Sequence, residues 1–164
     1  MKGKKLLFLF LALLLPIAIF VFLKIFGRNE FEVPVLHHDS IPATSAHCNV
    51  RYTTPYRVAD SVMTKLVANG SDSLYVLYFN GPAAGAMKRV ATEFSGESLA
   101  IAAVSDHIPA EEISFLKQCI LLMGNDVSVA LVDHRKRIRG YYDADDRDEV
   151  DRLIVEIKII LKKY

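Results

Sequence analysis

The stretch SLYVLYFNGPAAGAMKRVATEF, residues 73–94, decides the fold of this chain. Its apolar run from Leu74 to Phe79 is uninterrupted, which is typical of a strand covered by helices on both faces of a sheet. A turn rich in glycine, proline and alanine follows, and apolar residues then recur at helical spacing, at Met87, Val90, Ala91 and Phe94. The stretch predicts a strand, a turn and a helix, a corner where many α/β proteins hold their chemistry. The turn itself contains no cysteine, histidine or carboxylate.

The elements after this corner are also distinct in the sequence. Residues 99–104, LAIAAV, form a second apolar run, so the two runs and the helix between them predict a βαβ unit with parallel strands. A helix should begin at Pro109, which suits a first helical position, and should end at Gly124. Residues 127–132 and 137–142 flank the polar turn DHRK and predict a hairpin. A last helix has an acidic start, a basic end and apolar residues at helical spacing, namely Val150, Leu153, Ile154, Ile157, Ile160 and Leu161.

The order of the elements predicts the class of fold. Upstream of the core, residues 56–62, YRVADSV, predict a further strand. The elements from residue 73 onward follow the order β-α-β-α-β-β-α, which is the order of a thioredoxin-like domain. We therefore expect an α/β fold of the thioredoxin-like class, with a mixed central sheet flanked by helices.

An apolar run near the start of the sequence predicts a membrane anchor. It is uncharged over residues 6–23 and continues past one lysine to residue 26, long enough to cross about 30 Å of hydrocarbon. Lys2, Lys4 and Lys5 precede it, so the bias of basic residues predicts a single pass through the inner membrane with the remainder on the periplasmic side. We expect a cytoplasmic tip at 1–5, a transmembrane helix at 6–26, a tether at 27–47 and a domain at 48–164. A cleaved signal peptide is the alternative, but no A-x-A pattern follows the run.

The charge balance excludes one class of partner. The sequence has 20 Lys+Arg and 19 Asp+Glu, but four lysines precede Arg28, so the part from Arg28 onward has 16 basic against 19 acidic residues. A mildly acidic domain does not offer the basic face that a nucleic acid needs. Residues 133–139, DHRKRIR, form a basic segment on this acidic background. It is either a solvated turn or a contact for anionic lipid or an acidic partner.

Residues 130–161, ALVDHRKRIRGYYDADDRDEVDRLIVEIKIIL, resemble the C-terminal part of the SCO1/SenC family. The resemblance rests on a strand, a turn, an R-G-Y-Y-type strand and an acidic helix start. The sequence PYRVADSV at residues 55–62 and the membrane anchor are also similar to the family pattern. The resemblance implies a membrane-anchored, thioredoxin-like protein of copper homeostasis and cytochrome oxidase assembly. Its implied partners are oxidase subunits or another SCO-like protein.

This chain departs from the family at its metal site. Members carry a C-x-x-x-C pair after the first core strand and a histidine before the hairpin, and these ligands suit Cu(I). Here the corresponding segments are NGPAAGAM, residues 80–87, and GNDVSV, residues 124–129. Both thiols and the histidine are missing, and Met87 offers a weak thioether on a helix face that should be buried. We therefore expect no copper or redox motif at this corner, no catalytic constellation and no enzyme activity.

Other residues of the chain could replace the missing ligands. Cys48 and Cys119 are the two cysteines, and they could form a disulfide, remain two unpaired thiols or act as a redox pair. His37, His38 and His47 lie with Cys48 in or beside the tether, where they form either a displaced copper or zinc site or a solvated linker.

Three hypotheses for function follow. The first is an SCO-like accessory factor that binds proteins and has lost its metal site. The second is a copper carrier with ligands displaced to the segment from His37 to Cys48. The third is a thiol-disulfide oxidoreductase that uses Cys48 and Cys119, although neither stands at a helix start.

Overall fold

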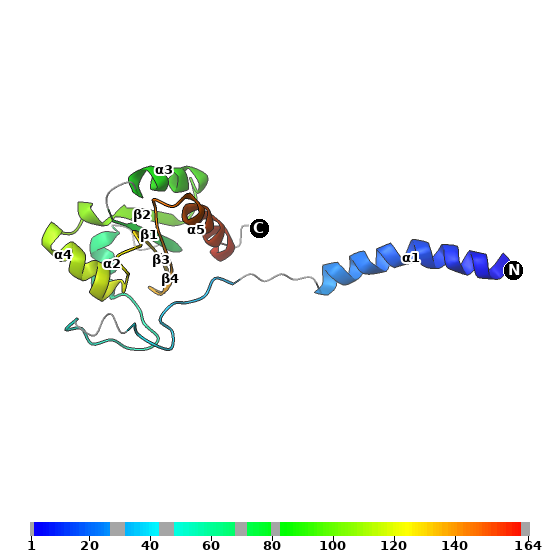
Figure 1. The fold of residues 1–164 in the computed structure, drawn as a ribbon, viewed down its shortest axis with the longest axis horizontal. Coiled ribbons are helices and arrows are strands. Elements are labelled where there is room, and N and C mark those ends of the chain that lie inside the picture. Colours follow the sequence, from blue (N-terminus) through cyan, green and yellow to red (C-terminus); the bar gives the residue numbers. More distant parts are fainter. Residues whose placement is uncertain (1, 27–31, 43–47, 68–71, 80–82, 162–164) are drawn as a thin grey trace. The chain divides into compact units, whose positions relative to one another are not determined.

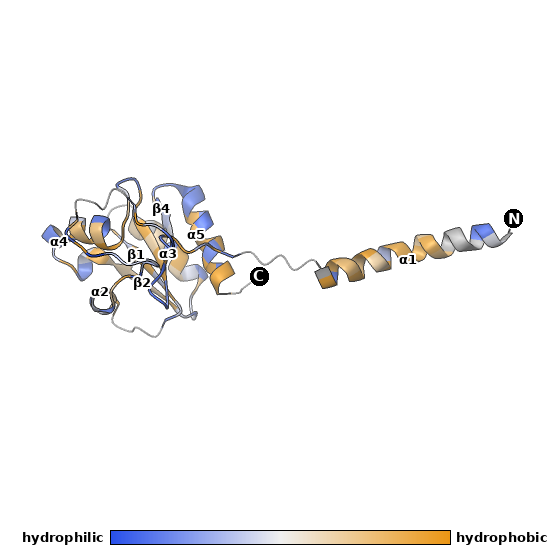
Figure 2. Ribbon diagram, turned by 90° about the horizontal axis from the view of Figure 1, so that it is seen from below, coloured by the Kyte–Doolittle hydropathy of each residue, from blue (hydrophilic) through white to orange (hydrophobic). Residues whose placement is uncertain are grey.

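The computed structural model of the chain describes residues 2–26, 32–42, 48–67, 72–79 and 83–161. The chain divides into two compact units, Met1–Glu32 and Val33–Tyr164. The first unit contains helix α1 (Lys2–Phe26), which is long and apolar enough to cross a membrane (Figure 1). Figure 2 shows that apolar residues make up most of this helix. This part of the chain therefore has the length and composition predicted for residues 6–26.

The second unit is an α/β domain. Its main elements are α2 (Asp60–Leu66), β1 (Leu74–Tyr78), α3 (Ala83–Glu93), β2 (Leu99–Ala103), α4 (Ala110–Phe115), β3 (Val129–Asp133), β4 (Ile138–Tyr142) and α5 (Arg147–Ile160). A short 3-10 helix, η2 (Val104–Asp106), follows β2, and α4 continues directly into a π-helix, η3 (Leu116–Ile120). The helix predicted from Pro109 to Gly124 is thus present, but it begins at Ala110, changes its winding at Leu116 and ends at Ile120.

The sheet has the strand order β2-β1-β3-β4. Strands β1 and β2 are parallel, with Leu74 paired to Leu99, and α3 forms the crossover between them. Strand β3 runs antiparallel to both β1 and β4. The predicted βαβ unit and the predicted hairpin are both confirmed.

Helices cover both faces of this sheet (Figure 1). On one face, side chains of β1 and β3 pack with α3 and α5 in a cluster that includes Val76, Met87, Leu131, Leu153 and Ile157. On the other face, alternate residues of the same strands pack with α2, η3 and the segment before α2, in a cluster that includes Tyr56, Leu66, Leu77, Leu116 and Val132. Continuous apolar strands were predicted to be covered on both faces, and this arrangement explains why they are apolar throughout.

Part of the predicted tether belongs to the folded unit. The backbone N–H of Leu36 donates to the carbonyl oxygen of Ile138 at 2.9 Å, so this segment lies along β4. Val33 is 4% exposed and belongs to the unit that extends to Tyr164. Residues 27–31 and 43–47 of the tether lie outside the described residues.

The strand predicted at residues 56–62 is wrong. Residues 56–59 are irregular and pair with no strand in the described part, and helix α2 begins at Asp60. The aspartate is favourable in a first helical turn, and Met63 and Leu66 lie three residues apart, so both face the core. Over seven residues this helical spacing is difficult to distinguish from strand alternation.

The hairpin and α5 are joined through Tyr142. A side chain at position 140 would meet the Tyr142 ring, so Gly140 makes room for it. The Tyr142 hydroxyl donates to a carboxylate oxygen of Glu156 at 2.6 Å. The guanidinium of Arg152 lies 4.4 Å from the centre of the same ring. The R-G-Y-Y pattern is thereby explained by packing between β4 and the last helix.

Candidate functional site

The corner between β1 and α3 presents no ligand among the residues that the structure describes. Residues 80–82 lie outside this part of the chain, and α3 begins at Ala83. Ala83 and Met87 are each 2% exposed and belong to the cluster packed under α3 and α5. The expectation that Met87 faces the core is confirmed. Its thioether is therefore part of the packing between helix and sheet.

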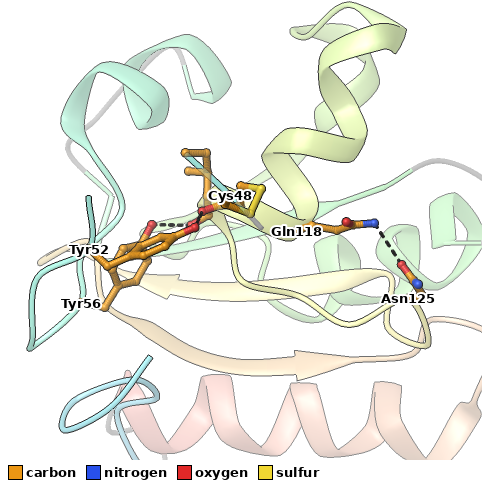
Figure 3. The surroundings of a disulfide bond; sticks show 7 residues. Cys48, Tyr52, Tyr56, Gln118 and Asn125 are labelled. Atoms are coloured by element: carbon orange, nitrogen blue, oxygen red, sulfur yellow. Dashed lines mark hydrogen bonds between the residues drawn. A yellow bond between two sulfur atoms is a disulfide. The ribbon is translucent and has the colours of Figure 1, made fainter. Parts of the chain in front are cut away.

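Cys48 and Cys119 form a disulfide, with Cα atoms 5.6 Å apart and a sequence separation of 71 (Figure 3). Cys119 lies in η3 and is 4% exposed. Of the alternatives that the sequence leaves open for these cysteines, the structure does not have the two unpaired thiols: it has the cross-link, which is also the oxidised state of a redox pair. While it is oxidised, the pair supplies no thiolate for nucleophilic attack or for Cu(I) coordination.

Three tyrosines donate to three successive carbonyl oxygens at the end of η3. The Tyr52 hydroxyl donates to Cys119 at 2.9 Å and the Tyr56 hydroxyl to Ile120 at 2.6 Å, as Figure 3 shows. The Tyr141 hydroxyl donates to the carbonyl oxygen of Leu121, also at 2.6 Å. The last carbonyls of a helix have no partner within it, so these hydroxyls supply the missing hydrogen bonds.

The surroundings of Tyr56 and Tyr141 favour the protonated form of their hydroxyls. Burial, with a smaller effect of Tyr52, raises the pKa of Tyr56 to about 12. Burial also raises the pKa of Tyr141 above its usual range. The hydroxyls of Tyr56 and Tyr141 therefore remain donors at physiological pH. The pairing of these hydroxyls with a helix end leaves no pattern in the sequence from which it could be predicted.

The histidines of the predicted metal segment have separate surroundings. His37 has a left-handed backbone conformation, with φ of 55°. Its Nε2 lies 2.9 Å from the Tyr141 hydroxyl oxygen, and since that hydroxyl donates to Leu121, Nε2 is the donor. Desolvation lowers the pKa of His37, partly offset by a hydrogen bond with the Ser40 backbone. His37 is thus held in the folded unit by its hydrogen bond to Tyr141.

His38 is exposed and its Nδ1 lies 2.7 Å from a carboxylate oxygen of Asp39. His47 lies outside the described residues. Across the ranges that the structure describes, no group of three or more His, Cys, Asp and Glu side chains is placed to hold a metal. The structure pairs Cys48 with Cys119 rather than bringing it to His37 or His38.

A buried charge cluster lies beneath the basic β3–β4 turn. Asp133 is 2% exposed, and its carboxylate accepts from the backbone N–H groups of Arg135 and Arg137 at 2.9 and 3.0 Å. It also pairs with the guanidinium groups of Arg137 at 2.7 Å and of Arg139 at 3.3 Å. Arg139 in addition donates to the carbonyl oxygen of Val33. The basic segment predicted at 133–139 is therefore partly internal, and one acidic residue organises it.

The candidate reactive groups named above are engaged with other groups of the protein. The cysteines are joined to each other, the tyrosines are hydrogen-bonded donors, and the buried carboxylate is paired with arginines. No family model, no curated protein and no solved structure matches the chain.

Proposed function

We propose that this chain is an SCO-like protein of the thioredoxin-like class, anchored in the inner membrane by α1 with its domain on the periplasmic side. Its role is that of an accessory binding factor in the assembly of the copper site of a respiratory cytochrome oxidase. It acts neither as the copper carrier nor as a thiol-disulfide enzyme.

The topology of the domain supports this proposal. A parallel pair joined by a crossover helix, followed by an antiparallel hairpin and a last helix, is the order expected of a thioredoxin-like domain. Helices α3 and α5 share one face of the sheet, while η3 packs on the other. Fold alone does not establish activity, so the role depends on the site.

The observation that carries the proposed role is that the two cysteines are paired with each other and that neither lies in the segment between β1 and α3. A carrier or an oxidoreductase of this class would need thiolates beside the start of α3. That helix begins with Ala83, Ala84 and Gly85, and the cysteines join the segment before α2 to η3. A domain that retains the architecture without the reactive groups is best suited to recognising a partner.

Co-purification from membranes tests the proposed role. The full chain, tagged at its C-terminus, is solubilised in a mild detergent and captured, and the recovered oxidase subunits and SCO-like proteins are quantified. The control is residues 1–32 fused to an unrelated exported domain, because this unit is compact without the rest of the chain. We expect enrichment with the full chain only. Equal recovery with the control would show that the domain recognises neither partner.

A Cu(I) competition titration tests the copper-carrier alternative. The chain is titrated with and without a reductant, beside its Cys48→Ala variant. We expect no binding tighter than that of an isolated thiol in either case. Stoichiometric tight binding that the substitution abolishes would instead identify Cys48 as a ligand and support the displaced site with His37, His38 and His47.

A further inference from the structure

A polar depression lies between the segment before α2 and the β3–β4 turn. Its volume is about 380 Å³. This is within the size range of small-molecule sites, about 300 to 1,000 Å³. One wall is formed by residues 57–60, and the other by the turn; the lining includes Arg57, Val58, Asp60, His134, Arg135 and Lys136.

The lining is basic although the domain as a whole is mildly acidic. Arg57, Arg135 and Lys136 contribute three cations, and Asp60 contributes a carboxylate. Within the described ranges, neither Arg57 nor Arg135 is in an ion pair, and both are exposed. The ammonium of Lys136 lies 4.9 Å from the centre of the Tyr75 ring. Two guanidinium groups therefore remain available to an anion.

The walls of the depression are fixed to each other. The backbone N–H of Val58 donates to the carbonyl oxygen of Lys136 at 2.9 Å, which ties the two walls together. The N–H of His134 donates to Ser73 at 3.0 Å, and Asp133 holds the turn from within. The Asp133 carboxylate is already paired with Arg137 and Arg139, so it is engaged beneath the turn.

The depression lies at the opposite end of the sheet from the corner after β1. Leu74, at the start of β1, pairs with Asp133, whereas Tyr78, at its end, pairs with Val129. A ligand in the depression would therefore leave the corner between β1 and α3 free. Ligand binding at this depression would therefore be independent of the proposed function.

We propose that this depression binds the phosphate group of a small ligand, held chiefly by Arg57 and Arg135. Guanidinium groups present planar donors that match phosphate oxygens, and a concave, preformed basic wall lowers the cost of ordering them. The phosphate belongs either to a free phosphate ester or to a phospholipid headgroup, since both offer the same oxygens to these donors.

Titration of the full chain in maltoside micelles tests the site. The probes are inorganic phosphate, glycerol 3-phosphate and short-chain phosphatidylglycerol, with short-chain diacylglycerol as the uncharged match of the last. We expect saturable binding of at least one phosphate compound and none of diacylglycerol. Binding of glycerol 3-phosphate identifies a free ester as the source, and binding of phosphatidylglycerol alone identifies a headgroup.

Three variants make the test specific. Replacing both arginines, Arg57→Gln with Arg135→Gln, should weaken binding about tenfold or more, because two charge-assisted hydrogen bonds are lost. Asp60→Asn should tighten it about twofold to threefold by removing repulsion. Arg147→Gln, at an exposed arginine of α5, should leave it unchanged.

The proposal is overturned if no phosphate compound binds saturably, or if the double variant binds as tightly as the native chain. It is also overturned if a polyglutamate peptide binds while phosphate compounds do not, since the surface would then recognise an acidic protein segment.

Discussion

Asp133 is the residue on which the β3–β4 turn depends. It ends β3, is almost fully buried and accepts hydrogen bonds from the backbone of two turn residues, Arg135 and Arg137. Its charge is matched by Arg137 and Arg139. The buried carboxylate and the arginines stabilise the fold only as a complete set. If the carboxylate is lost, a buried arginine remains without its counter-ion, which is energetically costly.

Replacement of this carboxylate should therefore be strongly destabilising. We expect Asp133→Asn to lower the free energy of unfolding by roughly 3 kcal/mol, since it leaves Arg139 buried without its counter-ion. Urea denaturation followed by circular dichroism measures this change. The control is Asp145→Asn, at an exposed position, where the change should stay below about 0.5 kcal/mol. Equal effects of the two substitutions would contradict the role given to Asp133.

The same residue gives the domain a pH dependence. Burial alone would raise the pKa of Asp133, but hydrogen bonds and charge from Arg137 outweigh it, so the pKa lies below the ordinary value of 3.8. At a pH between the lower pKa of Asp133 in the folded chain and its ordinary pKa in the unfolded chain, the unfolded chain binds a proton that the folded chain does not. The stabilisation is therefore complete above about pH 4 and is lost as the pH falls further. Asp133→Asn should flatten the pH profile of stability in this acidic range.

At the scale of elements, the segment before α2 is fastened to the end of η3 by covalent and polar contacts together. The disulfide joins Cys48 to Cys119, and the hydroxyls of Tyr52 and Tyr56 donate to carbonyls at the same helix end. These two tyrosine hydrogen bonds join residues that are 67 and 64 positions apart in the sequence. They hold the segment in place around the cross-link.

Removal of the cross-link should lower the stability of the domain without unfolding its sheet. For a sequence separation of 71, the chain-entropy model assigns the disulfide about 4 kcal/mol. We expect Cys48→Ala combined with Cys119→Ala to lower the free energy of unfolding by an amount of this order, measured in urea. A reductant should lower the stability of the native chain equally and leave the double variant unchanged. A native chain that is insensitive to the reductant while the double variant is weakened would mean that packing of the cysteines, and not the bond, stabilises the domain.

Some of these elements were predictable from sequence and others were not, for physical reasons. The apolar runs of β1 and β2 and the long amphipathic pattern of α5 are strong signals, and each matches an observed element. Helix α2 was mistaken for a strand because Val62, Met63 and Leu66 give too few repeats to fix the period. Contacts between Tyr141 and Leu121 depend on how distant segments meet, which no local pattern encodes.

At the scale of the whole molecule, α1 differs in kind from the other helices. From Phe10 to Ile25 its side chains are exposed on all sides, and most are apolar. A helix that is apolar all round is stable only when lipid or protein covers it. Its 25 residues span about 37 Å at the helical rise of about 1.5 Å per residue, which exceeds the roughly 30 Å of a hydrocarbon core.

This helix should keep the chain in the membrane, uncleaved and in one orientation. After alkaline carbonate extraction we expect the chain in the membrane pellet, with an intact mass that includes α1. A C-terminal reporter that is active only outside the cytoplasm should be active, because we expect the lysines at the start of α1 to remain inside. Replacing Lys2, Lys4 and Lys5 by glutamate should reduce that activity, whereas Lys88→Glu, at an exposed position of α3, should not. A mass that lacks the helix would instead identify it as a cleaved signal peptide, and the domain would then act as a released protein.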